Sequence, residues 1–313
     1  EQIRKTTLFA IAAPQQLRRV KRLELKRPGR LWAGPPADYY IITPREFLPA
    51  ASELARYRNG RIPGVSNGRA EVVVLEDIYD EFNFGLSEPR AVKRFLQEKR
   101  PGYVLLVGDA TYDYRNNLRR TQTPGVPAYE IGEGFNPESG DRRTLALDAW
   151  YADLEGEGAS PDLILGRVCV RKVIEYENQP AGYWHRRFFL LADDEYQRYP
   201  DRPDELRFRH IEQCEGIGVM AGERFDLVKV YLTEFPFLGP KSKPGANQEL
   251  MRQLNLGALV WFFFGHGSAF ALTHEEVLTV TRLSDISNGN RVPFCFMGSC
   301  SVGRFDDTLQ ECI

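Results

Sequence analysis

Short hydrophobic runs alternate with amphipathic stretches along most of the chain. Uninterrupted apolar runs of four to eight residues are typical of strands buried on both faces of a parallel sheet, and apolar residues spaced by three or four are typical of helices packed on it. The predicted strands are residues 38–43, 70–75, 103–109, 187–192, 227–232, 257–264 and 292–298. The predicted helices are residues 46–58, 76–81, 88–98, 173–182, 203–221 and 246–254. This alternation predicts α/β architecture with parallel strands and right-handed crossovers.

The same pattern divides the chain into two α/β subdomains in tandem. We expect the first over residues 36–135 and the second over residues 136–313, with residues 1–35 forming a linker or the end of a preceding β-rich region. Residues 110–141 are rich in Gly, Pro and Asn and are predicted to be a long loop. The sequence stops shortly after Cys300, so we expect the second subdomain to be truncated at its C-terminal end.

Two of the apolar runs end at residues that can carry chemistry. Residues 257–267 read GALVWFFFGHG and end at His266 between two glycines, and residues 292–300 read VPFCFMGSC and end at Cys300. Ligands of open α/β sheets bind at the carboxyl ends of the strands. If the two runs are neighbouring parallel strands, His266 and Cys300 emerge side by side, as a base and a nucleophile.

A histidine beside a cysteine raises the reactive thiolate fraction, which is what thiol catalysis requires. The alternative is that Gly-His-Gly is only a tight turn and that Cys300 is a buried hydrophobic residue, since cysteine is among the most buried residue types. The flanking glycines favour the first interpretation because they allow a ligand to approach the backbone closely.

The composition argues against several classes of binding partner. Lys plus Arg (41) nearly balance Asp plus Glu (43), and the net charge of -2 gives no global field that would favour nucleic acid or anionic lipid. The five cysteines form no C-x-x-C pair and only four histidines are present, which argues against a zinc framework. The chain shows no signal peptide and no apolar run near the roughly 18 residues that a spanning helix needs.

Several segments together resemble the gingipain family of cysteine peptidases, and within it the branch that contains the type IX secretion system sortase, PorU. The resemblance covers about residues 36–313. It rests on GALVWFFFGHGS and FMGSCSVGRFDD near the end of the chain, preceded in order by LEDIYDEF, YVLLVGD, PDLILGR and LLADD.

The resemblance implies a caspase-like (gingipain-type) fold, a three-layer αβα arrangement with mostly parallel sheets. It implies Cys300 as nucleophile, His266 as general acid/base, and the backbone N–H groups of Gly267 and Cys300 as the oxyanion hole. For a supporting acid it points to Asp194 and then to Glu195, the alternative being that these are solvated loop acids. Further candidates for the substrate cleft are Gly265, Ser268, Ser299 and Asp109.

The chain departs from the pattern of this branch at a loop that resembles a cation-binding motif. The loop reads DLEGEG, so that Asp153, Glu155 and Glu157 are the candidate ligands, with glutamate at two positions where relatives have aspartate. Alternate carboxylates can ligate calcium, but the longer side chains change the loop geometry. We therefore expect no required cofactor and treat a structural calcium ion as an option. Of the remaining residues, Cys295 is expected in the core and His274 at the surface, although it could line the cleft.

By resemblance, the function is a cysteine endopeptidase, or transpeptidase, that removes C-terminal sorting signals from secreted proteins. Its partners would be a protein or peptide substrate and other secretion-system components, and its location would be extracellular or at the outer-membrane surface. One alternative is a general secreted endopeptidase of the gingipain type, which an acidic residue at the base of the substrate pocket would favour. The other is a non-catalytic surface binding module with the same fold, against which the intact His266 and Cys300 argue.

Overall fold

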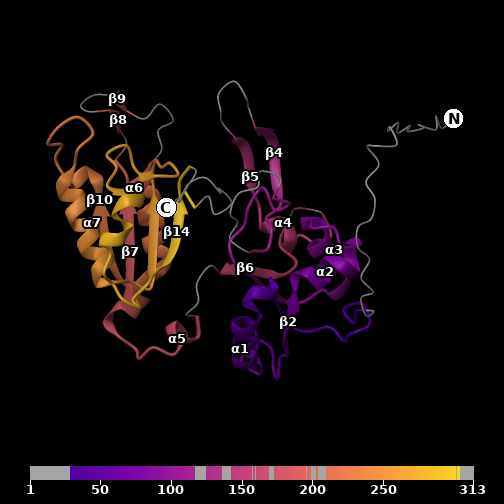
Figure 1. Ribbon diagram of the computed structural model, residues 1–313. Helices are drawn as coiled ribbons and strands as arrows, with labels where there is room; N and C mark the ends of the chain where they lie inside the picture. The colour runs from indigo at the N-terminus through magenta and orange to yellow at the C-terminus, as the bar shows by residue number, and fades with distance from the viewer. Residues whose placement is uncertain are drawn as a thin grey trace, which may run out of the picture.

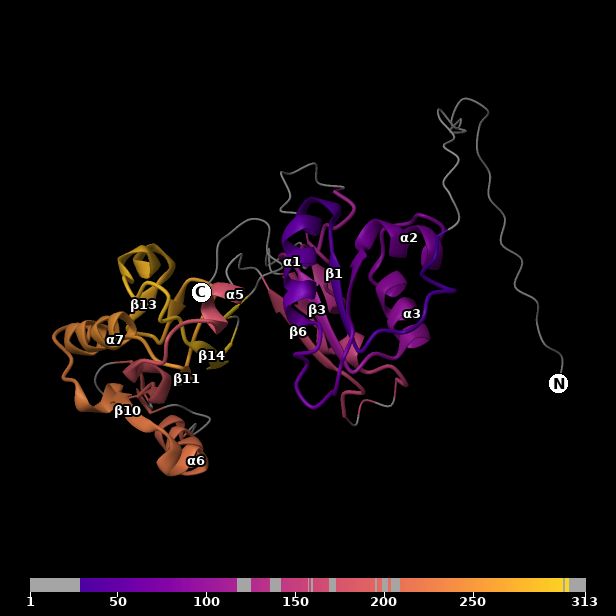
Figure 2. The same ribbon diagram turned by 90° about the horizontal axis from the view of Figure 1, so that it is seen from below.

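A computed structural model describes residues 29–116, 125–135, 142–156, 158, 160–168, 173–194, 196–198, 202–203, 209–300 and 302–303. These residues form two α/β lobes, each built on a four-stranded sheet (Figures 1 and 2). Every strand pair within the two large sheets is parallel. The prediction of an α/β fold with mostly parallel sheets is confirmed.

The first sheet has the strand order β2-β1-β3-β6 and carries helices on both faces. Ile42 packs in a core with Phe95 of α3, whereas its neighbour Ile41 packs in a second core with Leu54 of α1. Both faces are therefore buried, which explains the uninterrupted apolar runs in the sequence. The elements are β1 (Tyr39–Thr43), α1 (Leu48–Arg58), β2 (Ala70–Val74), α2 (Leu75–Asn83), α3 (Pro89–Lys99), β3 (Tyr103–Val107), α4 (Ala149–Ala152) and β6 (Ile164–Val168).

The strand β6 belongs to the first lobe, although the sequence-based boundary placed it in the second subdomain. Tyr103 of β3 lies opposite Ile164 of β6, and this parallel pairing continues to Val107 and Val168. Tyr151 of α4 is also fully buried in the core of the first lobe. The chain therefore leaves the first sheet after Val168 and not at residue 136. The sequence could not show this, because the apolar pattern of a strand does not indicate which sheet the strand joins.

The segment predicted as a long loop contains a β-hairpin in part. The strands β4 (Glu130–Phe135) and β5 (Arg142–Ala146) pair antiparallel and project from the first lobe (Figure 1). Ile131 and Leu145 on these strands are exposed. The hairpin was missed because the sequence of its strands carries glycine and charge and shows no apolar repeat.

The second sheet has the strand order β10-β7-β11-β14. Cys214 of α6 packs on one face with Leu190, and Leu250 of α7 packs on the other with Leu191. Each lobe is thus a sheet between two helical layers. The elements that follow β6 in the chain are α5 (Val173–Glu177), which packs on the first lobe, β7 (Arg187–Ala192), β8 (Tyr196–Arg198), β9 (Arg202–Pro203), α6 (His210–Ala221), β10 (Asp226–Tyr231), α7 (Pro244–Leu256), β11 (Val260–Phe264), β12 (Ala271–Leu272), β13 (Leu278–Thr279) and β14 (Phe294–Gly298).

Two helices of this half are shorter than predicted. The helix α5 ends at Glu177, ahead of Pro180, and is followed by a short 3-10 helix over Tyr183–Arg186. The helix α6 begins at His210, whereas the sequence suggested a start at Pro203, which instead lies in β9. In both cases a proline lies outside the helix, where its missing N–H costs nothing.

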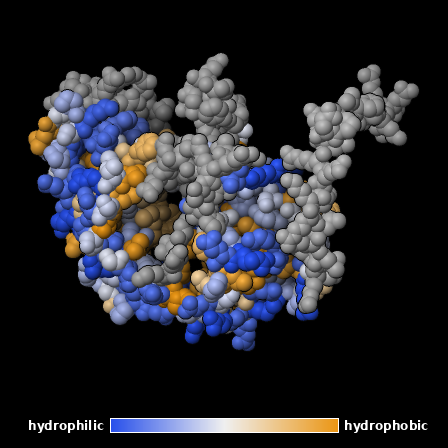
Figure 3. Space-filling model, in the orientation of Figure 1, coloured by the Kyte–Doolittle hydropathy of each residue, from blue (hydrophilic) through white to orange (hydrophobic). Residues whose placement is uncertain are grey.

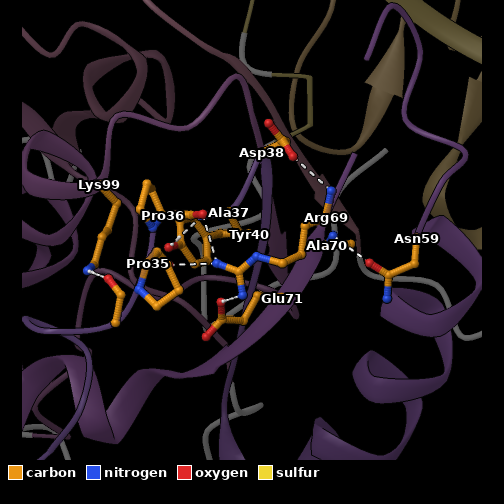
Figure 4. Close-up of polar contacts among 11 residues, drawn as sticks. Pro35, Pro36, Ala37, Asp38, Tyr40, Asn59, Arg69, Ala70, Glu71 and Lys99 are labelled. Atoms are coloured by element: carbon orange, nitrogen blue, oxygen red, sulfur yellow. Dashed lines mark hydrogen bonds and ion pairs between the residues drawn. The ribbon is translucent and has the colours of Figure 1, made fainter. Parts of the chain in front are cut away.

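Polar contacts fix the chain just before β1 (Figure 4). The Arg69 guanidinium donates to the carbonyl oxygens of Pro35 and Pro36 at 2.6 and 2.8 Å. The Lys99 ammonium donates to the carbonyl oxygen of Gly34 at 2.8 Å. These contacts hold the segment that precedes β1; of the predicted linker over residues 1–35, residues 1–28 lie outside the described part.

The visible surface is largely hydrophilic, with hydrophobic side chains exposed along the inner side of the second lobe, where β14 lies (Figures 1 and 3). Val292, Phe294 and Phe296 have exposed fractions of 49%, 63% and 49%. Cys295 is exposed as well, so the prediction that it lies in the core is wrong. Among the described residues, no helix has the length and apolarity that crossing a membrane requires.

Candidate active site

The candidate site lies at the carboxyl ends of three adjacent strands of the second sheet. Phe264, the last residue of β11, is the register partner of Ala192 on β7 and of Gly298 on β14. The next residues are Asp193 on one side and Ser299 on the other. Two hydrogen bonds extend the pairing past the strands, from Asp193 N–H to Phe264 O at 3.0 Å and from Gly265 N–H to Gly298 O at 3.2 Å.

The register brings the two predicted reactive residues to the same level of the sheet. Phe264 lies opposite Gly298, so His266 and Cys300 each follow two residues later on neighbouring parallel strands. Cys300 is a free, exposed thiol, and His266 is partly buried. The expectation that the two apolar runs are adjacent parallel strands is confirmed.

The glycines around His266 are needed for space and not for a left-handed backbone. A Cβ at Gly265 would lie 2.4 Å from the Cβ of Asp193, and a Cβ at Gly267 would lie 2.3 Å from the Ser299 Oγ. Neither glycine has a positive φ. The absence of both side chains lets the β7 and β14 ends close around His266.

The carboxylate that contacts His266 along the main chain is that of Asp193. Its Oδ2 accepts a hydrogen bond from the His266 N–H at 2.9 Å. Asp194, predicted to be the supporting acid, has its Oδ2 at 2.5 Å from the Lys243 Nζ, and both side chains are buried. Both residues lie at the strand end that the sequence indicated, and the role of Asp194 as supporting acid stays a prediction. Glu195, the second candidate, lies outside the described residues.

The carboxyl groups of Asp193, Asp194 and Glu275 lie close together near His266. One oxygen each of Asp193, Asp194 and Glu275 lies within 4.8 Å of the others, so the group could hold a cation. The Lys243 ammonium, which also donates to Leu232 O at 2.7 Å, already supplies one positive charge here. Burial raises the pKa of Asp193 well above its ordinary value, with Glu275 adding to the effect, and burial likewise raises the pKa of Glu275.

Two further histidines lie against His266; the sequence left a place in the cleft open for His274 and indicated no role for His210. The His274 ring is 4.3 Å from the His266 ring between centroids, and the His210 ring is 5.3 Å away. The His210 Nδ1 is 3.0 Å from the Asp194 carbonyl oxygen, which can only accept, so this nitrogen carries the proton. His274 therefore lies in the site and not in a separate surface position. Its position eight residues after His266, in a turn, gave no periodic signal.

The segment after His266 folds back on itself and fixes the predicted oxyanion region. Gly267 forms a bridge with Leu272, whose two hydrogen bonds come from Thr273 N–H to His266 O and from Ser268 N–H to Ala271 O. This bridge does not use the N–H of Gly267, which is the group predicted to bind the oxyanion.

The other cleft candidates have different surroundings. The Ser268 hydroxyl accepts from the N–H groups of Phe270 and Ala271 at 3.2 and 3.1 Å, which is a turn-forming role. Ser299 lies against Gly267 and borders the site. Asp109 follows β3 at the rim of the first sheet, so the topology separates it from the sheet that carries His266.

The predicted calcium loop has protein partners at its described residues. The Asp153 Oδ1 accepts from Gly156 N–H at 2.9 Å, and Glu155 forms an ion pair with Arg100 at 2.6 Å. The Lys93 ammonium donates to the carbonyl oxygen of Asp153. Positive side chains therefore already lie at this loop; Glu157 is outside the described residues, and calcium binding stays a prediction.

The comparisons with known proteins concern the family and the fold of the chain. A family model, peptidase family C25, matches residues 33–313. The structure is similar to the crystal structure of the Arg-specific cysteine proteinase gingipain R (RgpB), with a TM-score of 0.60, 19% identity, and coverage of 88% of this chain and 57% of that one. It is equally similar to the complex of the RgpB pro- and mature domains from Porphyromonas gingivalis, at 20% identity over 88% of this chain and 58% of that one.

A weaker similarity links the chain to dimeric latent PorU from Porphyromonas gingivalis, with a TM-score of 0.36, 22% identity, and coverage of 45% of this chain and 15% of that one. No curated protein matches the chain. The chain spans somewhat more than half the length of the gingipain chains, whose identity is low enough that they indicate the fold alone. The family model covers most of the sequence, and the chain belongs to peptidase family C25.

Proposed function

We propose that this chain carries the catalytic centre of a cysteine peptidase, with Cys300 as nucleophile and His266 as general acid/base. The observation that supports this most is the register of β11 and β14, which sets the two residues at one level on adjacent strand ends. The exposed free thiol and the family of the chain agree with it. Groups held on rigid strands keep the geometry that thiol catalysis needs.

In the proposed reaction, the His266 imidazole takes the proton of the Cys300 thiol, and the thiolate attacks the carbonyl carbon of a peptide bond. The carbonyl π electrons move to the oxygen, and the N–H groups of Gly267 and Cys300 stabilise the resulting oxyanion. The tetrahedral intermediate collapses as the C–N bond breaks and the His266 imidazolium gives its proton to the leaving amine. Water, deprotonated by His266, then cleaves the thioester and restores the thiol.

We further propose that the substrate is a C-terminal sorting signal of secreted proteins, released at the cell surface with other secretion-system components. This finer proposal rests on the sequence segments that resemble the PorU branch. A general endopeptidase is the second candidate, because the similar solved structure is an Arg-specific proteinase. Adding an amine acceptor at several concentrations measures how water and the amine compete for the acyl-enzyme. A transferase gives mostly the aminolysis product at low amine concentration, whereas a hydrolase gives mostly the acid.

The proposed activity is tested by digestion of a mixed peptide library with the protein of residues 1–313. We expect cleavage products with the wild type, none with Cys300→Ala, and a rate about 10²- to 10⁴-fold lower with His266→Ala, the usual contribution of general acid–base catalysis. Cys295→Ala is the matched control, an exposed thiol on the same strand, and should keep the wild-type rate. Cleavage that persists in Cys300→Ala would exclude the proposed nucleophile.

A further inference from the structure

The turn over residues 273–276 is fixed to the main chain of His266. It connects the antiparallel strands β12 and β13. The Thr273 N–H donates to the carbonyl oxygen of His266 at 2.8 Å, and the Val277 N–H donates to Leu272 O at 3.1 Å. Asp193 accepts from the His266 N–H on the other side of the same residue. Both main-chain polar groups of His266 are therefore held, one by this turn and one by the end of β7.

The side chain of His274 extends this contact to the imidazole itself. The two rings lie 4.3 Å apart between centroids with an interplanar angle of 41°, so their faces are in van der Waals contact. The His210 ring of α6 contacts the same imidazole at 5.3 Å and 88°. Since His210 is 2% exposed and bonded to Asp194 O, its position is fixed by the core. The orientation of His266 then depends on whether His274 is also fixed.

The backbone of the turn is strained in a way that fixes His274. Thr273 has a φ of 63° and Glu276 a φ of 52°, both in the left-handed region. This region is unfavourable for a non-glycine residue and most of all for a β-branched one such as Thr273. Such strain persists only where the surroundings determine the conformation, and it is concentrated at functional sites.

Three contacts over-determine the turn. The Glu275 N–H donates to the Thr273 Oγ1 at 3.2 Å. The Glu275 carboxyl group is buried with those of Asp193 and Asp194. The Asn247 side chain of α7 donates to Val277 O at 2.5 Å. The turn is thus tied to β7 and to α7, and His274 is carried on the strained segment between these ties.

We propose that His274 is a positioning residue, which holds the His266 imidazole by ring contact in the orientation that serves Cys300. This inference rests on the proposed function and specifies a part of it. The strained turn holds the His274 ring in place against that imidazole. In this role His274 acts through its ring contact and not through proton exchange with the substrate, so His274→Phe, which keeps a flat ring, is the rescue variant.

The test compares three variants of the protein of residues 1–313 with the wild type. His274→Leu removes the ring while keeping a bulky apolar side chain, and His274→Phe restores a flat ring. The matched control is His185→Leu, because His185 is also stacked on an aromatic ring, that of Trp184 at 3.8 Å, but outside the site. Peptide hydrolysis gives kcat and KM, iodoacetamide labelling of Cys300 gives its reactivity, and thermal unfolding shows that each variant is folded.

We expect kcat and the Cys300 labelling rate of His274→Leu to fall about 10- to 100-fold, the loss that a displacement of about 1 Å at a reacting group produces. KM should stay unchanged, His274→Phe should recover most of the rate, and His185→Leu should match the wild type. Wild-type rates in His274→Leu would overturn the inference but leave the Cys300–His266 proposal intact. A Phe variant as slow as the Leu variant, or a change confined to KM, would also overturn it. A wild type that neither hydrolyses peptides nor labels at Cys300 would overturn both proposals.

Discussion

At the scale of single residues, the site depends on the carboxyl group of Asp193, whose ionisation inside the folded protein is unfavourable. Asp193 is fully buried and accepts a hydrogen bond from the main chain of His266. Burial and the nearby Glu275 raise its pKa, so its protonated form is favoured in the folded protein relative to the unfolded chain. The bond to His266 needs only an acceptor oxygen, which a neutral side chain can supply.

Two substitutions at Asp193 distinguish the contribution of its hydrogen bond to stability from the contribution of its charge. Asp193→Asn keeps an acceptor and should change the free energy of unfolding little. Asp193→Leu leaves the His266 N–H without this acceptor and should cost about 1–3 kcal/mol, the penalty of an unsatisfied buried donor. Denaturant titrations of both variants at pH 4, before the charge of Asp193 affects the comparison with the wild type, check this; equal stabilities of the two variants would contradict the role of the bond.

The raised pKa of Asp193 also predicts a pH dependence. The folded state holds the Asp193 proton more tightly than the unfolded state, so this residue contributes stability that is present below the unfolded pKa of about 3.9 and is lost as pH rises through the folded value. Between pH 4 and pH 7, Asp193→Asn should therefore gain stability relative to the wild type. A difference that does not change with pH would show that Asp193 has an ordinary pKa.

The glycine before the histidine is predicted to tolerate no side chain. In Gly265→Ala the new methyl group would lie 2.4 Å from the Asp193 Cβ, and we expect a loss of about 1–3 kcal/mol from overpacking together with loss of activity. Gly216→Ala is the matched control, because open space surrounds that position on α6 and alanine favours helix. The melting temperatures of the two variants should move in opposite directions.

At the scale of the elements, one buried ion pair joins the start of α7 to the end of β7. Lys243 directly precedes α7, and its ammonium lies 2.5 Å from the Asp194 carboxylate with both side chains almost fully buried. Lys243→Met should cost about 3–5 kcal/mol, because it leaves the buried Asp194 carboxylate without its lysine. Lys229→Met, which breaks the exposed pair with Glu215, should cost less than about 1 kcal/mol.

The double variant completes this test. If Lys243→Met destabilises the fold because the Asp194 charge stays buried without its lysine, adding Asp194→Asn should restore a large part of the lost free energy of unfolding. Chemical denaturation of the single and double variants measures this. An additive or larger loss in the double variant would mean that Lys243 acts mainly through its bond to Leu232 O and its contact with the Phe237 ring.

The elements also show which parts of the site the sequence can predict. The runs ending at His266 and Cys300 are uninterrupted apolar stretches, and this pattern predicts two parallel strands with polar residues at their ends. It does not predict that the run before Cys300 is an exposed strand. His274 and Lys243 lie in turns, where no periodic pattern exists, and only the folded chain brings them to His266 and Asp194. Adjacent residues at a strand end are equally hard to separate, since Asp193 and Asp194 differ only in the direction of the side chain.

At the scale of the whole molecule, the chain passes between the lobes through α5, which is attached to the first one. Val173 and Ile174 pack against the core between α1 and the first sheet, and Arg58 forms an ion pair with Glu177. The sheet membership of β6 could not be predicted, because the pairing partner of a buried strand depends on contacts across the whole lobe. The order of seven of the eight strands in the two large sheets followed from local patterns, β6 being the exception; their assignment to lobes did not.

The exposed strand β14 of the second sheet leads to a prediction about how strongly molecules of this protein associate with one another. Among the strands that the structure describes, β14 lies at the edge of the sheet, and Phe294 on it has an exposed fraction of 63%. Exposed apolar edge strands favour contact between molecules, and a lysine on an edge opposes it. Phe294→Lys should reduce self-association of the protein in static light scattering and leave the melting temperature nearly unchanged. Scattering equal to that of the wild type would contradict this.

The central claim, that Cys300 is activated by His266, is tested most directly by the rate at which each cysteine reacts with iodoacetamide at pH 7. The modified positions are read by mass spectrometry in the wild type and in His266→Ala. We predict fast labelling of Cys300 that His266→Ala slows, slower labelling of the exposed Cys295, and none of Cys214, whose pKa burial raises to about 12. Equal labelling of Cys300 and Cys295, or a Cys300 rate unaffected by His266→Ala, would contradict the account.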